Sequence, residues 1–132
     1  MLTCRTFVLT GIVLGGLPSG AAGQSQLIQV PLVSKQVAVR QLVVPPLDFV
    51  EVCANVKARR ALAWQFEAEE PLGFNTHLHL AGTKQYPQYG SPLSAAMSVA
   101  KGQLVPSSDQ EHCWMWTNPK SVPVSIRVQL GP

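Results

Sequence analysis

The sequence lacks every complete motif that would identify a common enzyme chemistry. It has no Gly-x-Ser-x-Gly element of serine hydrolases, no His-Glu-x-x-His element of zinc proteases, no phosphate-binding loop and no dinucleotide-binding fingerprint. Cysteine and histidine are present, but a cysteine nucleophile needs a free thiol with a base beside it. We therefore expect a protein without enzymatic activity.

Charged residues are scarce, at 13% of the chain, and the formal net charge is only +3. The basic residues are scattered along the chain. The one cluster, Lys57, Arg59 and Arg60, is typical of a solvated turn. So small a charge imbalance is not expected to attract nucleic acid.

Long hydrophobic runs are also missing. The apolar run at residues 6–17 is about 12 residues long, too short to cross a bilayer about 30 Å thick as a helix. It follows Arg5 and precedes the small residues 21–23 (AAG), which is the pattern of a signal peptide. We predict that residues 1–23 are a cleaved signal peptide. Residues 24–132 are then expected to form a single periplasmic or secreted domain without a transmembrane segment.

Cysteine occurs only three times, and Cys4 would leave with the signal peptide. Cys53 and Cys113 remain, an even number in an oxidising compartment. We predict a disulfide bond between them. It would close a loop of about 60 residues and contribute about 4 kcal/mol to the free energy of unfolding.

Helix patterns are almost absent after residue 23. Proline recurs between short runs of β-branched and aromatic residues that alternate with a period of two. This pattern predicts an all-β fold, an antiparallel β-sandwich of the jelly-roll type or a similar one. The expected strands are residues 27–33, 36–44, 48–54, 61–68, 73–80, 103–105, 111–117 and 122–130, with turns at 57–60 and 101–102, a long loop at 81–93 and an ambiguous segment at 94–100.

The alternation leaves open which face of the predicted strand 111–117 is buried. Trp114 and Trp116 share one face with His112, whereas Cys113 and Met115 lie on the other. Burial of large aromatic side chains favours the first face as core. An exposed pair of tryptophans would instead mark a surface for a partner or a ligand.

Residues 62–80 (LAWQFEAEEPLGFNTHLHL) resemble the central strands of the GOLD domain, a β-sandwich found in cargo receptors and lipid-binding proteins. The matching residues are Trp64, Phe66, Gly73 and Phe74, while Pro71 stands where the family has an acidic residue. The segment CWMWTNPKSVPVSIRVQL is similar to the family's last hairpin. The chain also resembles small exported bacterial proteins with FNxHxH and CWMWTN segments. The resemblance implies a GOLD-like sandwich with a non-catalytic binding role.

The polar segment 81–93 contains Tyr86 and Tyr89 and is expected to be a loop of the kind that often carries function. We expect these tyrosines, with His77 and His79, to form a binding surface for a protein or a small ligand, without a cofactor. The chain would then be an exported binding or interaction domain. A further hypothesis is a structural subunit that adds a strand to a partner sheet.

Copper binding is the main alternative. His77 and His79 lie two residues apart on a predicted strand, so they share one face about 7 Å apart along the chain, and the same holds for Cys113 and Met115. Imidazole, thioether and thiolate groups together select copper, chiefly Cu(I). Cys113 would be available only outside the disulfide. A set of His77, His79 and His112 would suit Zn²⁺ or Cu²⁺. The competing interpretations are surface histidines and a methionine packed on aromatic rings.

Overall fold

The computed structural model describes residues 26–89 and 96–132. The predicted signal peptide with its cleavage site, residues 90–93 of the predicted loop and residues 94–95 of the ambiguous segment lie outside this part. The strands are β1 (Gln26–Gln29), β2 (Ala38–Val44), β3 (Phe49–Val56), β4 (Leu62–His79), β5 (Met97–Leu104), β6 (Gln110–Thr117) and β7 (Val124–Gly131). In the described residues, no helix is long and apolar enough to cross a membrane.

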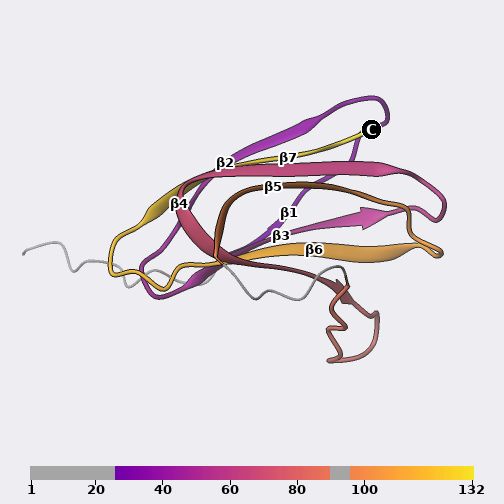
Figure 1. Cartoon of the computed structure of the whole chain (residues 1–132). Helices are drawn as coiled ribbons and strands as arrows, with labels where there is room; N and C mark the ends of the chain where they lie inside the picture. The colour runs from indigo at the N-terminus through magenta and orange to yellow at the C-terminus, as the bar shows by residue number, and fades with distance from the viewer. Residues whose placement is uncertain (1–25, 90–95) are drawn as a thin grey trace, which may run out of the picture.

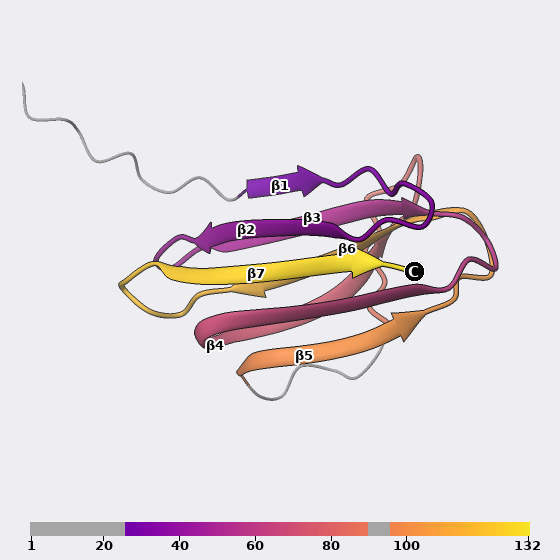
Figure 2. The same ribbon diagram turned by 90° about the horizontal axis from the view of Figure 1, so that it is seen from above.

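The strands form two layers that share β4 (Figures 1 and 2). Sheet 1 has the order β1-β3-β6-β4, and sheet 2 has the order β2-β7-β4-β5. Residues 63–68 of β4 pair with β7, and residues 73–79 pair with β6. In Figure 1, β4 runs along the upper layer and then curves down into the lower one. The all-β sandwich predicted from the sequence is therefore confirmed.

The sandwich is not entirely antiparallel, because β1 pairs with β3 in parallel while the other pairs are antiparallel. Between them the chain crosses to sheet 2 as β2 and then returns. β3 consequently runs in the same direction as β1. The sequence pattern could identify most of the strands but not this crossing between the layers.

Two predicted turns are instead parts of strands. An acidic turn at Glu69 and Glu70 is the simplest interpretation of the sequence between the predicted strands 61–68 and 73–80. In the structure these residues and Pro71 remain extended and exposed within β4, where the register against β5 shifts. Lys101 and Gly102 likewise stay in β5, since they pair with residues of β4. Gly102 lies under the indole of Trp64, and a Cβ atom there would be 2.5 Å from Trp64 Cζ2. Glycine is therefore used here because it has no side chain to clash with the indole, and not because the chain turns.

The tryptophans of β6 fill the space between the two sheets. Trp114 and Trp116 are fully buried. The ring of Trp116 lies 5.3 Å from that of Phe66 and 5.5 Å from that of Phe74, measured between centroids. The face of β6 that the sequence left open is thus settled, and Cys113 and Met115 point to the other side of sheet 1.

The disulfide predicted between Cys53 and Cys113 is present. The two residues are direct partners across β3 and β6, so the bond fastens these neighbouring strands together. Both cysteines have no exposed surface although they lie on the outer face of sheet 1. Other side chains must therefore cover this face, and they form the candidate site.

Candidate metal centre

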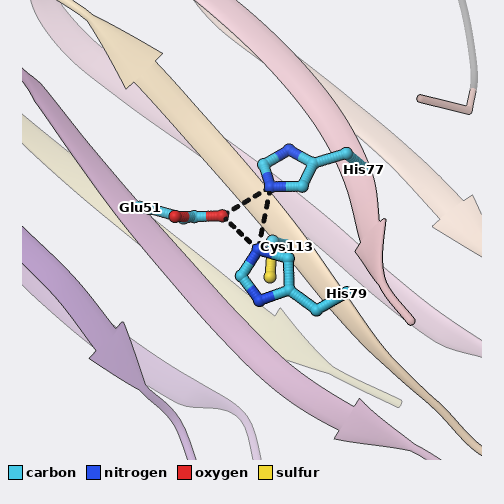
Figure 3. Close-up of side chains that lie close together, drawn as sticks. All are labelled: Glu51, His77, His79 and Cys113. Carbon is cyan, nitrogen blue, oxygen red and sulfur yellow. Dashed lines mark hydrogen bonds and ion pairs between the residues drawn. The ribbon is translucent and has the colours of Figure 1, made fainter. Parts of the chain in front are cut away.

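The candidate site lies on the outer face of sheet 1, where three strands each contribute side chains (Figure 3). Glu51 comes from β3, Cys113 from β6, and His77 and His79 from β4. Two-residue alternation places both histidines on one face. His77 pairs in register with Cys113, which in turn pairs with Cys53. The sheet register therefore gathers residues from segments that are far apart in the sequence.

Three potential ligand atoms converge on one point. The Nε2 atoms of His77 and His79 are 3.2 Å apart, and Glu51 Oε1 lies 2.5 Å from the first and 3.1 Å from the second. Ligand atoms of a tetrahedral zinc ion, with bonds of about 2.0–2.1 Å, are about 3.3 Å apart. The separations from His79 Nε2 are close to this value. Two of the three separations thus match ligands around one ion, whereas the 2.5 Å between Glu51 Oε1 and His77 Nε2 is the length of a short hydrogen bond and would have to increase to about 3.3 Å.

Hydrogen bonds at the opposite ring nitrogens fix the orientation of both imidazoles. His77 Nδ1 lies 2.9 Å from Asn75 Oδ1, and His79 Nδ1 lies 2.7 Å from Glu111 Oε2. Both partner oxygens accept, so each Nδ1–H donates and each neutral ring keeps a lone pair at Nε2. Gln29 Nε2 donates in turn to Glu111 Oε1 at 2.5 Å. Such partners are typical of metal-ligating histidines.

The buried carboxylate of Glu51 needs a positive charge or hydrogen-bond donors beside it. Glu51 and His77 are each 7% exposed, and Glu51 Oε1 has no hydrogen-bond donor in the described part of the chain apart from these imidazoles. A buried carboxylate is costly unless a charge or a donor compensates it. Protons on the two Nε2 atoms would let both rings donate to Glu51 Oε1, which lies 2.5 and 3.1 Å from them. A divalent ion is the other way to compensate the charge, and it would bind the same three atoms.

Tyr86 places the predicted loop beside this cluster. Its ring centroid is 5.0 Å from that of His79 and 6.2 Å from that of His77, and its side chain is 56% exposed. The loop is held against β4 by the hydrogen bond from Leu78 N to Pro87 O. The groove has a volume of about 370 Å³ and is lined by Leu27, Phe49, Glu51, Asn75, His77, His79, Tyr86, Gln88 and Met115.

Tyr89 does not join this surface. Its backbone pairs with Thr76 through the hydrogen bond from Tyr89 N to Thr76 O, and its ring packs against His112, 5.2 Å away between centroids. His112 faces the interior because neighbouring residues of a strand point to opposite sides. Of the residues predicted to form the binding surface, Tyr89 therefore lies apart from Tyr86, His77 and His79. For the same reason, the hypothetical set of three histidines does not form.

The structure brings together part of the predicted copper set and adds residues that sequence reasoning missed. His77 and His79 lie side by side, and Met115 lines the groove beside them. The sulfur of Cys113 is bonded to that of Cys53 in the disulfide. The missed residues are Glu51, Asn75 and Glu111. One signal could have indicated Glu51. If Cys53 and Cys113 are cross-strand partners, the residue two places before Cys53 must lie opposite Met115, on the same face.

His112 gives the fold a dependence on pH. It is 3% exposed, and neither ring nitrogen has a hydrogen-bond partner in the described residues. Burial lowers the pKa of His112. The unfolded chain therefore takes up this proton first, and stability falls as the pH drops below about 6.5, by at most about 1.4 kcal/mol per pH unit. Urea unfolding between pH 7.5 and 5 should show a smaller loss in His112→Phe than in the wild type. Equal losses would contradict the assignment.

No protein-family model and no curated protein matches the chain. It is similar to the solved pre-peptidase C-terminal domain of a Bacillus anthracis collagenase, with a TM-score of 0.49, 10% identity, and coverage of 82% of this chain and 97% of that one. It is also similar to PliG of Aeromonas hydrophila, a periplasmic inhibitor of g-type lysozyme, with a TM-score of 0.47, 10% identity, and coverage of 82% and 98%. A mutant of the Escherichia coli inhibitor PliG is similar as well, with a TM-score of 0.48, 11% identity, and coverage of 82% of this chain and 98% of that one.

Proposed function

We propose that this chain is an exported, non-enzymatic domain that binds a divalent transition-metal ion through Glu51, His77 and His79. One observation carries the proposal: the three potential ligand atoms lie within 3.2 Å of one another, while Asn75 and Glu111 hold the far nitrogens of both imidazoles. When both Nε2 atoms are unprotonated, the three atoms are all acceptors, and a cation at their centre compensates them.

The donor set indicates the class of ion. Two imidazole nitrogens and one carboxylate oxygen suit Zn²⁺ and Cu²⁺, and the same combination holds zinc in several metalloenzymes. Thiolate ligands, which favour Cu(I), are not part of this set while the disulfide is closed, although the thioether of Met115 lines the same groove and would favour copper over zinc. The copper interpretation of the sequence therefore becomes a proposal for a divalent ion, with Zn²⁺ and Cu²⁺ as the two candidates.

The surroundings of the site support a role in binding. A disulfide is typical of a protein outside the cytoplasm, in keeping with a periplasmic or secreted location. Three protein ligands leave a four-coordinate ion one position for water or for a donor from a bound molecule. The groove beneath Tyr86 and Met115 would give a small ligand or a protein side chain access to that position.

Glu51→Gln tests the proposal. The amide keeps an oxygen but loses the negative charge, so we expect the affinity for Zn²⁺ to fall about tenfold, since ligand charge and type set the affinity. Equilibrium dialysis of the oxidised protein against Zn²⁺, repeated with Cu²⁺, measures the change.

Glu67→Gln is the matched control because it removes one carboxylate from an exposed position of β4 in sheet 2. Its affinity should equal that of the wild type. A wild type that binds neither ion at one equivalent would refute the proposal, and so would equal losses in the two variants.

A further inference from the structure

The disulfide and the proposed metal site share one small volume. Cys113 Sγ, a carboxylate oxygen of Glu51 and a nitrogen of each of His77 and His79 all lie within 4.8 Å of one another. Figure 3 shows the Cys113 sulfur directly behind the imidazole of His79. A sulfur atom bonded to a second sulfur is a poor ligand, whereas a thiolate is among the strongest ligands of zinc. The oxidation state of Cys113 therefore decides whether the site has three donors or four.

The geometry permits Cys113 to become the fourth ligand. In a tetrahedral zinc site, bonds of about 2.3 Å to sulfur and 2.0–2.1 Å to nitrogen place these two ligands about 3.6 Å apart. A sulfur within 4.8 Å thus needs to move by only about 1 Å. Opening the disulfide frees the side chain to rotate. The backbone stays in place because β6 remains paired with β3 over eight residues and with β4 over seven.

We propose that Cys113 is a redox-controlled fourth ligand, so that the closed disulfide gives a three-donor site and the reduced protein a four-donor site that binds Zn²⁺ more tightly. This inference rests on the proposed function. A dithiol reductant supplies two electrons and two protons to the S–S bond, yields the thiols of Cys53 and Cys113, and becomes a disulfide itself. The Cys113 thiol then releases its proton to solvent as it binds the ion.

Thermodynamic linkage makes the effect reciprocal. If reduction tightens zinc binding by some factor, saturating zinc favours the reduced form by the same factor. Each tenfold gain corresponds to about 30 mV in the reduction potential of the disulfide. Zinc would therefore make this disulfide easier to reduce, and reduction would retain the ion.

A second set of potential ligands competes with this one. Cys53, His79, Glu111 and Cys113 also present ligand atoms within 4.8 Å of one another. The two sets share His79 and Cys113, so they cannot both be occupied by an ion at the same time. In the first set Cys113 is the sulfur ligand, whereas Cys53 belongs only to the second. Removing one cysteine at a time therefore separates them.

The test compares Cys53→Ser with Cys113→Ser, which both lose the same disulfide but keep different thiols. We expect Cys53→Ser to bind Zn²⁺ at least tenfold more tightly than Cys113→Ser. Competition with a chromophoric chelator under anaerobic conditions measures the two affinities. With Co²⁺ as probe, only Cys53→Ser should show a thiolate-to-cobalt charge-transfer band in the near ultraviolet. Equal affinities, or tighter binding by Cys113→Ser, would overturn the proposal.

Two further samples keep the outcome interpretable. If either serine variant fails to fold by circular dichroism, reduced and oxidised wild type are compared in its place, with the same tenfold difference expected and the same band in the reduced form alone. The oxidised wild type separates this inference from the proposed function. If it binds Zn²⁺ while reduction changes nothing, only the redox control fails. If it does not bind, the proposed function itself fails.

Discussion

Trp116→Ala is expected to lower the free energy of unfolding by about 4 kcal/mol, the usual cost of deleting a fully buried aromatic side chain. The indole has no exposed surface and packs against Phe66 and Phe74, which lie on the two halves of β4. It therefore joins the part of β4 in sheet 1 to the part in sheet 2. Its loss leaves a cavity at the place where the two layers are held together.

Urea unfolding followed by circular dichroism measures this effect, because the usual stability of a small domain, about 5–15 kcal/mol, exceeds the expected loss and the variant would still fold. Val122→Ala is the control, since Val122 is 57% exposed and lies between β6 and β7. Its stability should change by no more than about 0.5 kcal/mol. A loss below 1 kcal/mol for Trp116→Ala would mean that the two halves of β4 do not share one core.

His77→Ala is expected to lower the affinity for Zn²⁺ at least a hundredfold, about 2.7 kcal/mol in binding free energy. The substitution removes one of two imidazole ligands and leaves Glu51 and His79 as a pair. Asn75→Ala should have a smaller effect of about tenfold, because Asn75 acts only by orienting His77 through its hydrogen bond to Nδ1.

Competition titrations of the oxidised variants provide the comparison, with Gln103→Ala, at an exposed position of β5, as the control. The expected order of affinity is wild type and Gln103→Ala, then Asn75→Ala, then His77→Ala. An Asn75→Ala variant that binds as tightly as the wild type would show that the hydrogen bond does not hold the imidazole for an ion. A His77→Ala variant with unchanged affinity would remove His77 from the ligand set.

Local sequence patterns predicted most of the strands because alternation within a strand depends only on near neighbours. The inward alternation of Trp114 and Trp116 is one example. The same patterns failed at Glu69, Glu70 and Pro71, where residues typical of a turn instead bend one long strand between the layers. Charged residues and proline are tolerated there because the segment is exposed where its pairing with β5 is interrupted.

The resemblance to the GOLD domain stays a prediction. Its aromatic residues do meet in the structure, since the rings of Trp64 and Phe66 both contact Phe74, at 5.4 and 4.8 Å between centroids. These contacts explain why an aromatic-x-Phe pattern precedes Gly73-Phe74. They are core contacts, and they carry no information about a ligand.

The candidate site was only partly predictable for a different reason. His77 and His79 are two residues apart, so the strand period alone places them on one face. Glu51 reaches them across β6, and this contact depends on the pairing of strands that are distant in the sequence. The disulfide was the one long-range restraint that the sequence offered. Used as a register mark, it would have placed Glu51 on the same face as Cys113.

X-ray absorption at the zinc edge of the oxidised protein, loaded with one equivalent of Zn²⁺, tests the central claim most directly. The account predicts two imidazole nitrogens and at least one carboxylate oxygen at about 2.0–2.1 Å, with no sulfur at about 2.3 Å. A shell made only of oxygen, without the outer scattering of imidazole rings, would contradict the assignment of His77 and His79 as ligands.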